Sequence, residues 1–436
     1  MTSIFNPPLP ADCTLAQYWT DTHGSAQSLA IANAATQSPG PLLLICENNE
    51  QVEQFKRELR YFCAPCPGLE VFSLSDWETL PYDNFSPHQD IISDRLSALY
   101  HLPQLERGIV VLSINSLMHK LPPHTYIAQN SLDLQVGQTL RVDAMRKQLV
   151  DAGYQAVDSV HEHGEFAVRG SIIDLFPMGS PLPYRIDLLD EEIETLRSFD
   201  PETQRSAALV DAIRLLPGRE YPLDATGITT FRANFRETFD VDLRQCPLYQ
   251  DVSEGISSPG LEYYLALFFH SLDSLFNFLP SQTTICTVGN LKQAGDQFWH
   301  DIKSRYEDRQ IDRYRPILKP DQIFVDIDFV LAALKAYPQI NFKDSKSAFS
   351  FATRPLPYLG SNAKLANPFT TLQEFMRGQD ARVLFCAETA GRRETLLEIL
   401  KPIGLQPRAF EHWQDFVASE AAMRLQKVLL KQKKLV

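Results

Sequence analysis

The sequence predicts an α/β protein, in which a parallel-sheet domain carries a small inserted α+β domain and is followed by a partial α/β domain. Three observations predict this fold class. Short apolar strands alternate with helical patterns in residues 42–114. Short strand signals, separated by turn residues, follow one another in residues 165–199. One more strand–helix step comes after a polar, Pro-interrupted stretch at residues 343–367.

The composition limits the class of protein. A length of 436 residues is too great for one hydrophobic core, so three or four structural units are expected. The net charge of −13 disfavours general binding to a nucleic-acid backbone. No apolar run reaches the length of a membrane span, and the first residues do not have the pattern of a secretion signal. We therefore expect a cytoplasmic protein with no membrane partner.

The first part of the parallel-sheet domain is expected in residues 1–125. Strands are expected at residues 42–45, 71–74 and 109–114. The last of these is purely apolar, which is typical of a parallel sheet that is buried on both faces. Residues 76–102 lead from a strand end, through a Pro-rich loop, into a helix.

The inserted α+β domain is expected in residues 131–215. It begins with a helix at residues 143–152, where apolar positions recur at helical spacing. Strands with turn residues between them follow at residues 165–168, 171–176, 184–189 and 193–199.

The parallel-sheet domain is expected to resume in residues 216–342 and to end at a linker in residues 343–367. Its further strand is expected at residues 285–288. Its helices are expected at residues 231–239, 261–269, 298–305 and 329–337.

A last α/β domain is expected in residues 368–436, with a strand at 383–386 and a helix at 390–400. One strand with its helices cannot close a core, so this domain is expected to be incomplete. Its basic end favours a solvated helix or the end of a cut chain over a contact with nucleic acid or membrane. The basic residues there are Lys427, Lys431, Lys433 and Lys434.

The sequence lacks the phosphate-binding loop that an ATP-driven motor needs. Such a loop surrounds the phosphates with backbone amides and a lysine in the pattern GxxxxGK[ST], which does not occur here. Residues 23–26, before a helix expected at residues 29–35, stand where such a loop could lie, but they include no lysine. The acidic segment at residues 186–192 imitates a magnesium-binding strand end, although an acidic hairpin turn is the favoured interpretation. We expect no catalytic residue, no cofactor and no enzymatic activity in this chain.

Two pairs of residues are candidates for metal binding. Cys63 and Cys66 are the only close pair among seven cysteines, whereas a structural zinc site needs four ligands. His161 and His163 alternate along the chain, but no third ligand is identifiable. Reduced cysteines and a surface or structural role for the histidines are favoured, so we expect no metal site.

Several segments of the sequence together carry a resemblance to a known family. They are residues 76–102, residues 162–177 (EHGEFAVRGSIIDLFP), residues 178–188 (MGSPLPYRIDL), residues 199–205 (FDPETQR) and residues 260–269 (GLEYYLALFF). These segments resemble the N-terminal part of the bacterial transcription-repair-coupling factor family, Mfd. The resemblance spans about residues 15–340 at consistent spacing, and residues 388–393, ETAGRR, resemble the start of the family's next domain.

The resemblance implies a module similar to the excision-repair protein UvrB. That module is a degenerate helicase-like (RecA-like) domain whose insert, here residues 131–215, binds UvrA. It also implies that the family's ATP- and magnesium-dependent motor and its RNA polymerase-binding domain are absent from these residues. Residues 84–90 are too few for the hairpin with which UvrB probes damaged DNA. The alternative functions are an ATP-dependent DNA translocase, which describes the full-length family and its duplex DNA, and a stand-alone DNA-binding module.

Two arginines match contact positions of the family. Arg169 is the arginine of the VRG motif and Arg185 that of the PYRID motif. Both lie in expected strands, so their side chains can share one exposed sheet surface, and a planar guanidinium suits paired bonds to carboxylates. The alternative is that they form internal salt bridges with Asp174 and Asp187.

Three neighbouring residues complete the expected UvrA-binding site. Leu189 stands where the family often has an aromatic residue, so it keeps apolar area but loses ring stacking. Glu191 and Glu192 follow it and are expected to face basic groups of the partner.

Overall fold

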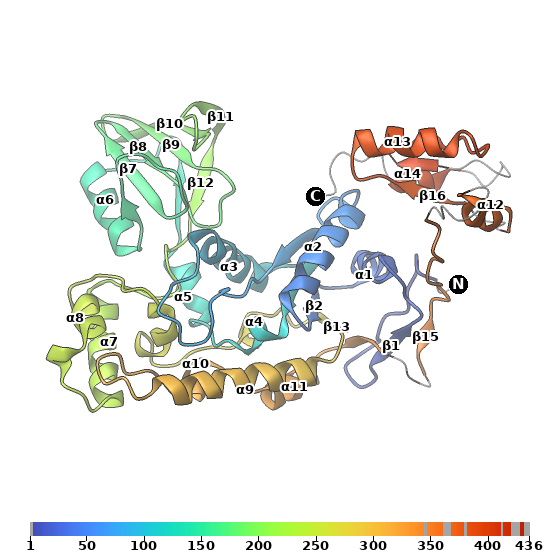
Figure 1. Cartoon of the computed structure of the whole chain (residues 1–436). Helices are drawn as coiled ribbons and strands as arrows, with labels where there is room; N and C mark the ends of the chain where they lie inside the picture. The colour runs from blue at the N-terminus through green and yellow to red at the C-terminus, as the bar shows by residue number, and fades with distance from the viewer. Residues whose placement is uncertain are drawn as a thin grey trace.

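The computed structural model describes residues 3–343, 345, 347–360, 368–378, 382–410, 413–419 and 428–430. A seven-stranded sheet, with the order β15-β1-β14-β13-β2-β4-β3, organises most of the chain (Figure 1). Every neighbouring pair in it is parallel. Its strands are β1 (Gln17–Thr20), β2 (Leu42–Cys46), β3 (Glu70–Ser73), β4 (Gly108–Ser113), β13 (Thr284–Val288), β14 (Gln339–Phe342) and β15 (Phe349–Ser350).

Helices cover both faces of this sheet, which explains why β2 and β4 are buried along their whole length. Successive residues of a strand point to opposite faces. Leu42 and Leu44 therefore pack in one core with α1 (Ala26–Gln37) and α2 (Asn49–Cys63). Leu43 and Ile45 pack in the other core, which includes α3 (Gln89–His101), α4 (Ile114–Met118) and α9 (Leu291–Arg309).

The strands predicted at residues 42–45, 71–74, 109–114 and 285–288 are confirmed. The sequence does not predict β1, β14 and β15, which are two to four residues long and carry no apolar run. Since β15 adds to the edge of the sheet, part of the stretch expected to be a linker is a strand.

The helix expected at residues 261–269 is a 3-10 helix, η3 (Leu261–Leu267), rather than an α-helix. The backbone of Tyr264 departs from helical geometry (φ −112°, ψ 15°). Two tertiary hydrogen bonds hold this segment, since the hydroxyl of Tyr263 donates to the carbonyl of Leu80 (2.8 Å) and that of Tyr264 to Pro316 (2.9 Å). The other helices of this part are α5 (His124–Gln129), α7 (Ala225–Thr238), α8 (Pro247–Ser253), α10 (Pro320–Ile323) and α11 (Ile327–Leu334), with single 3-10 turns η1 (Leu102–Gln104), η2 (Leu243–Gln245) and η4 (Leu275–Asn277).

The insert contains a six-stranded sheet with the order β11-β10-β9-β8-β7-β6, at the upper left of Figure 1. Only β6 and β7 pair in parallel, and the other neighbours are antiparallel. The predicted helix and four strands are confirmed by α6 (Val142–Asp151), β7 (Glu165–Arg169), β8 (Ile172–Leu175), β9 (Tyr184–Leu189) and β10 (Glu192–Phe199). The sequence does not predict β6 (Gln155–Ala156), β11 (Ser206–Val210), or the separate pair of β5 (Leu132–Gln135) with β12 (Ala212–Leu215).

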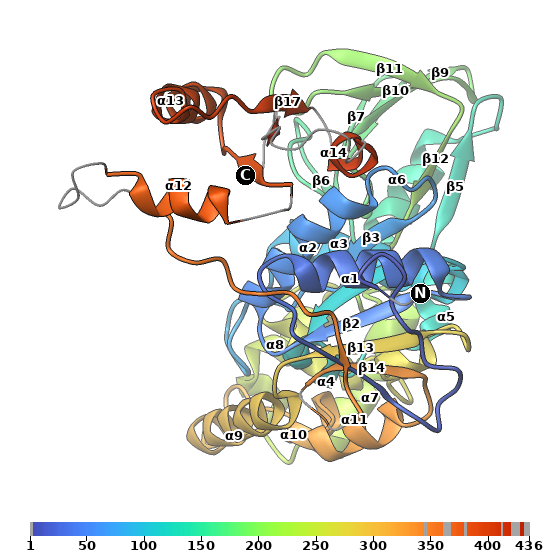
Figure 2. The same cartoon turned by 90° about the vertical axis from the view of Figure 1, so that its right-hand side faces the viewer.

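The C-terminal region has three parallel strands, in the order β16-β18-β17, where the sequence predicts one. Figure 2 shows β17 and the three helices of this region. They are β16 (Leu384–Cys386), β17 (Arg408–Phe410) and β18 (Val428–Leu430), and the helices are α12 (Thr370–Arg377), α13 (Ala390–Leu400) and α14 (Trp413–Ala418). Of the two expectations for the basic end of the chain, that of a solvated helix is wrong for residues 428–430. The backbone of these residues pairs with two neighbouring strands. The four lysines named above lie outside the described residues.

Among the helices in the described ranges, none is both long and apolar enough to cross a bilayer.

Candidate partner-binding surface

The connection between β1 and α1, where a phosphate loop could lie, is occupied by the chain itself. The hydroxyl oxygen of Thr353, beyond β15, accepts the backbone N–H of His23 (3.0 Å) and lies 3.1 Å from its Nδ1. The N–H of Thr353 donates to the carbonyl of Asp21 (3.1 Å). The polar groups of this connection therefore hold the strand at the sheet edge, and no lysine is present among residues 21–25.

The acidic segment at residues 186–192 forms most of β9 and the turn into β10, so its interpretation as a hairpin is confirmed. The carboxylate of Asp187 accepts a hydrogen bond from the hydroxyl of Thr195 on β10 (2.8 Å). An antiparallel hairpin does not present a row of strand ends to a phosphate, as the edge of a parallel sheet does.

In each of the two candidate metal pairs, one residue is buried or is bonded to neighbouring protein groups. Cys63 is buried at the end of α2, and burial raises the pKa of its thiol to about 12. His163 contacts the carboxylate of Asp90 (2.6 Å) through Nδ1 and the carbonyl of Ser180 (2.8 Å) through Nε2. No group of three or more potential metal ligands gathers in the part of the chain that the structure describes.

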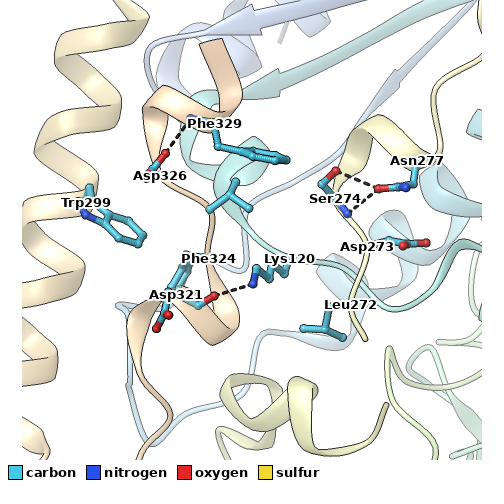
Figure 3. Close-up of a pocket in the computed structure, with 11 residues that line it drawn as sticks. Lys120, Leu272, Asp273, Ser274, Asn277, Trp299, Asp321, Phe324, Asp326 and Phe329 are labelled. Atoms are coloured by element: carbon cyan, nitrogen blue, oxygen red, sulfur yellow. Dashed lines mark hydrogen bonds between the residues drawn. The ribbon is translucent and has the colours of Figure 1, made fainter. Parts of the chain in front are cut away.

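A pocket of about 460 Å³ lies between α9, the segment from α10 to the start of α11, and residues 272–277, and Figure 3 shows its lining. Its polar groups mostly bind the chain itself. The ammonium of Lys120 donates to the carbonyl of Asp321 (2.6 Å), and Asp326 caps the first turn of α11 through the N–H of Phe329 (2.7 Å). Trp299 and Phe324 are apolar lining residues, and the hydroxyl of Ser274 donates to the side-chain oxygen of Asn277 (3.0 Å).

The register of the inserted sheet places the two predicted arginines on one face. Arg169 is opposite Ile172, and Arg185 is opposite Asp174. Paired residues of antiparallel strands point to the same face, as do alternate residues of one strand. Arg169 and Arg185 therefore share a face, as the sequence predicts.

The opposite face of this sheet is a packed core. Ile173 and Ile186 are buried there together with Met145 and Leu149 of α6. The face that carries the arginines is therefore the one that can contact solvent or a partner.

One end of the arginine-bearing face is covered by the chain. Val160 of the loop before β7 packs there on Ala167, Phe176 and Phe199. We call the uncovered remainder the open face. It consists of Arg169, Ile172, Arg185, Asp187, Leu189, Glu192, Thr195, Arg197 and Leu209.

Arg185 forms the internal salt bridge that the sequence leaves open as an alternative. Its Nε and one terminal nitrogen donate to the two carboxylate oxygens of Asp174, at 2.7 and 2.9 Å. Its side chain is 19% exposed and that of Asp174 only 3%. The guanidinium also lies 5.1 Å from the centroid of the Phe199 ring, and the paired Asp174 carboxylate raises the pKa of Arg185.

Arg169 is exposed and makes a different contact. Its guanidinium donates to the backbone carbonyl of Asp158, and it forms neither of the salt bridges considered for it from the sequence. The structure therefore does not seal both arginines within the domain.

Leu189 and the two predicted glutamates lie at the tip of the β9–β10 hairpin. Leu189 is 62% exposed and is opposite Glu192, which is also exposed. Glu191 lies in the turn, where its carbonyl accepts the N–H of Leu140 (2.6 Å) and its carboxylate is 3.5 Å from Arg141.

Arg197 belongs to the open face and is missed by reasoning from the sequence. It is directly opposite Arg185 on one side and Leu209 on the other. No motif singles it out, and the signal that identifies it is the cross-strand register, which follows from the tertiary structure.

Comparison with known proteins relates this region and the whole chain to one family. Residues 132–221 match the UvrB interaction domain, and residues 375–429 match the D3 domain of MFD. The transcription-repair-coupling factor of Haemophilus influenzae is 40% identical over 417 residues, which are 94% of this chain and 36% of that protein. The factor of Escherichia coli is 40% identical over 88% of this chain and 34% of its own length, and that of Rickettsia bellii is 29% identical over 65% and 25%. The chain thus spans about a third of the length of the two relatives that are 40% identical to it.

Proposed function

Because the chain is a relative of the transcription-repair-coupling factors over 94% of its length, we propose that it is a non-catalytic recruitment module of transcription-coupled nucleotide excision repair. It binds UvrA through the open face of its inserted domain and so brings excision repair to RNA polymerase stalled at DNA lesions in the bacterial cytoplasm. The match of residues 132–221 to the UvrB interaction domain supports this assignment of the partner.

One observation carries the proposal: the inserted sheet has one face in the core and one open face with arginine side chains. Arg169 is exposed on it, and its guanidinium is oriented by the carbonyl of Asp158. A guanidinium that is held in place loses little side-chain entropy when it binds a carboxylate of another protein.

We assign the remaining activities of the family to residues outside this chain. ATP and magnesium belong to the motor of the full-length relatives, and RNA polymerase and duplex DNA to their other domains. The β1–α1 connection supports this division, because it contains no lysine and its polar groups bind Thr353.

The first test is the substitution Arg169→Ala, with binding to purified UvrA measured by calorimetry. We expect the affinity to fall at least about fivefold, since an arginine that anchors an interface contributes more than about 1 kcal/mol. The matched control is Arg146→Ala, because Arg146 is exposed on α6 at the opposite side of the same sheet. Equal binding by the wild-type chain and Arg169→Ala would refute the role of Arg169, and no binding by the wild-type chain would refute the proposed function.

A further inference from the structure

The most exposed arginine of β9 and β10 on the open face is not the one that the family motif marks. The side chain of Arg197 is 44% exposed, against 19% for Arg185 directly opposite. Like charges directly opposite in a sheet are destabilising unless other groups compensate them. The two positive charges are compensated unequally, since only Arg185 donates to both carboxylate oxygens of Asp174.

Arg197 has no comparable partner. Its Nε is 3.7 Å from Asp187, too far for a hydrogen bond, and the carboxylate oxygen concerned already accepts the hydroxyl of Thr195. In the described part of the chain, the buried Nε of Arg197 has no hydrogen-bond partner. Its terminal nitrogens donate no hydrogen bond to another described residue, so the outer edge of the guanidinium is available.

An exposed apolar residue stands beside this guanidinium. Leu209 of the edge strand β11 is directly opposite Arg197 and is 70% exposed. Apolar contacts around a charged anchor exclude water and strengthen its bond to a carboxylate. Leu209 is therefore positioned to exclude water from the Arg197 guanidinium once a partner surface covers both residues.

The charge of the open face is unevenly distributed along the sheet. Three arginines, Arg169, Arg185 and Arg197, lie across its middle with Asp187 among them, while Glu192 and its neighbours Glu191 and Glu194 lie at the hairpin tip. A complementary partner surface presents a carboxylate to the arginines and a basic group to the tip.

We propose that Arg197 is the main anchor of the open face, that it binds a carboxylate of the partner through its two terminal nitrogens, and that Leu209 is its apolar neighbour. This inference rests on the proposed function, because it names the contact by which the open face holds UvrA. Arg185, which Asp174 neutralises, then supports the sheet and contributes less to binding.

The test compares Arg197→Ala, Arg197→Lys and Leu209→Ser in the full 436-residue chain, with purified UvrA as the probe and calorimetry as the measurement. We expect Arg197→Ala to weaken binding about thirtyfold and Leu209→Ser about fivefold. Arg197→Lys should recover only part of the loss, because lysine keeps the charge but cannot make a paired bond. Arg146→Ala, on the other side of the sheet, should stay within about twofold of wild type.

Thermal unfolding separates binding from folding. Removing Arg197 relieves its repulsion with Arg185 and removes an unpaired buried N–H, so Arg197→Ala should unfold at the wild-type temperature or above it. A lower unfolding temperature with unchanged affinity would show a structural role and overturn the inference. If wild-type chain binds UvrA and Arg197→Ala binds equally well, the inference alone fails. If wild-type chain does not bind, the proposed function fails and the inference with it.

Discussion

At the scale of single residues, the inserted domain shows how one type of side chain acquires different roles. Arg185 and Arg214 both donate two hydrogen bonds to one aspartate, at 2.7 and 2.9 Å for Asp174 and at 2.6 and 2.9 Å for Asp133. The first pair is largely buried, whereas the second is 46% and 63% exposed. Water competes less for the hydrogen bonds of the buried pair. The same hydrogen-bond geometry therefore contributes differently to the free energy of unfolding in the two pairs.

The two aspartates provide a matched pair of substitutions. We expect Asp174→Ala to lower the free energy of unfolding by about 3 kcal/mol, because it leaves the mostly buried Arg185 without its counter-ion. Asp133→Ala should cost at most about 1 kcal/mol, since water solvates the exposed Arg214. Urea unfolding followed by circular dichroism measures both, and similar costs for the two variants would contradict this account.

Glu262 makes stability depend on pH. Burial raises the pKa of its carboxyl group to about 7, although the hydroxyl of Ser86 donates to it (2.8 Å). The folded-state pKa lies above the unfolded-state value, so the folded chain retains a proton that the unfolded chain has lost. The free energy of unfolding should therefore decrease as pH rises from about 4.5 to 7, by up to about 1.4 kcal/mol per pH unit from this group.

Glu262→Gln tests this dependence, because a glutamine oxygen can still accept the hydrogen bond of Ser86. The variant should be more stable than wild type at pH 8, and the difference should shrink as pH falls and disappear at about pH 4, below the unfolded-state pKa. Chemical unfolding at both pH values measures it. A constant difference across this range would show that Glu262 does not titrate there.

At the scale of elements, α3 is the helix on which the insert rests. Its Asp90 contacts His163, its Ser93 accepts the N–H of Gly179 (2.8 Å), and its Arg95 pairs with Glu220, just beyond the insert. Arg95 and Glu220 are almost completely buried, and Arg95 also donates to the carbonyl of Ser75 (2.7 Å). This helix therefore connects the parallel-sheet domain to the middle of the insert and to the segment just after it.

We expect Arg95→Met to lower the free energy of unfolding by about 3–5 kcal/mol, because Glu220 then remains buried without a counter-ion. The double variant Arg95→Met, Glu220→Leu should be more stable than Arg95→Met alone, since it removes the unpaired charge as well. Denaturant unfolding of the single and double variants gives the coupling between the two residues. A double variant that loses the sum of the two single costs would contradict a direct pairing.

At the scale of the whole molecule, the parallel α/β sheet, which is of a kind that often binds nucleotides, is separate from the surface that we propose for partner binding. Thr353 binds the β1–α1 connection, and β15 pairs beside β1. The insert presents the open face on a second, mostly antiparallel sheet. Under the proposed function, a partner can therefore bind the insert without a change in the parallel sheet.

We expect the purified chain to hydrolyse magnesium-ATP no faster than buffer, and its unfolding temperature to be unchanged by ATP, because the lysine of a phosphate loop is missing. A coupled ATPase assay and thermal unfolding with and without nucleotide measure the two quantities. Turnover above background that persists after further purification would favour the translocase interpretation for this chain.

Much of the fold follows from local sequence. The apolar runs of β2 and β4 identify buried parallel strands, and α13 agrees with its predicted limits, because each of these signals lies within one segment. The edge strands β15 and β11, and β1 next to the edge, carry no comparable apolar run, and only their neighbours in space make them strands.

By itself the sequence determined the alternation of strands and helices and the placing of Arg169 and Arg185 in strands, because these signals lie within single segments. The register between strands puts the two arginines on one face. Only the tertiary structure decided that Arg185 is paired with Asp174 while Arg197 keeps an exposed guanidinium. The reason is physical: which charges meet depends on the register between strands and on burial, and both arise from contacts between segments that the chain order does not specify.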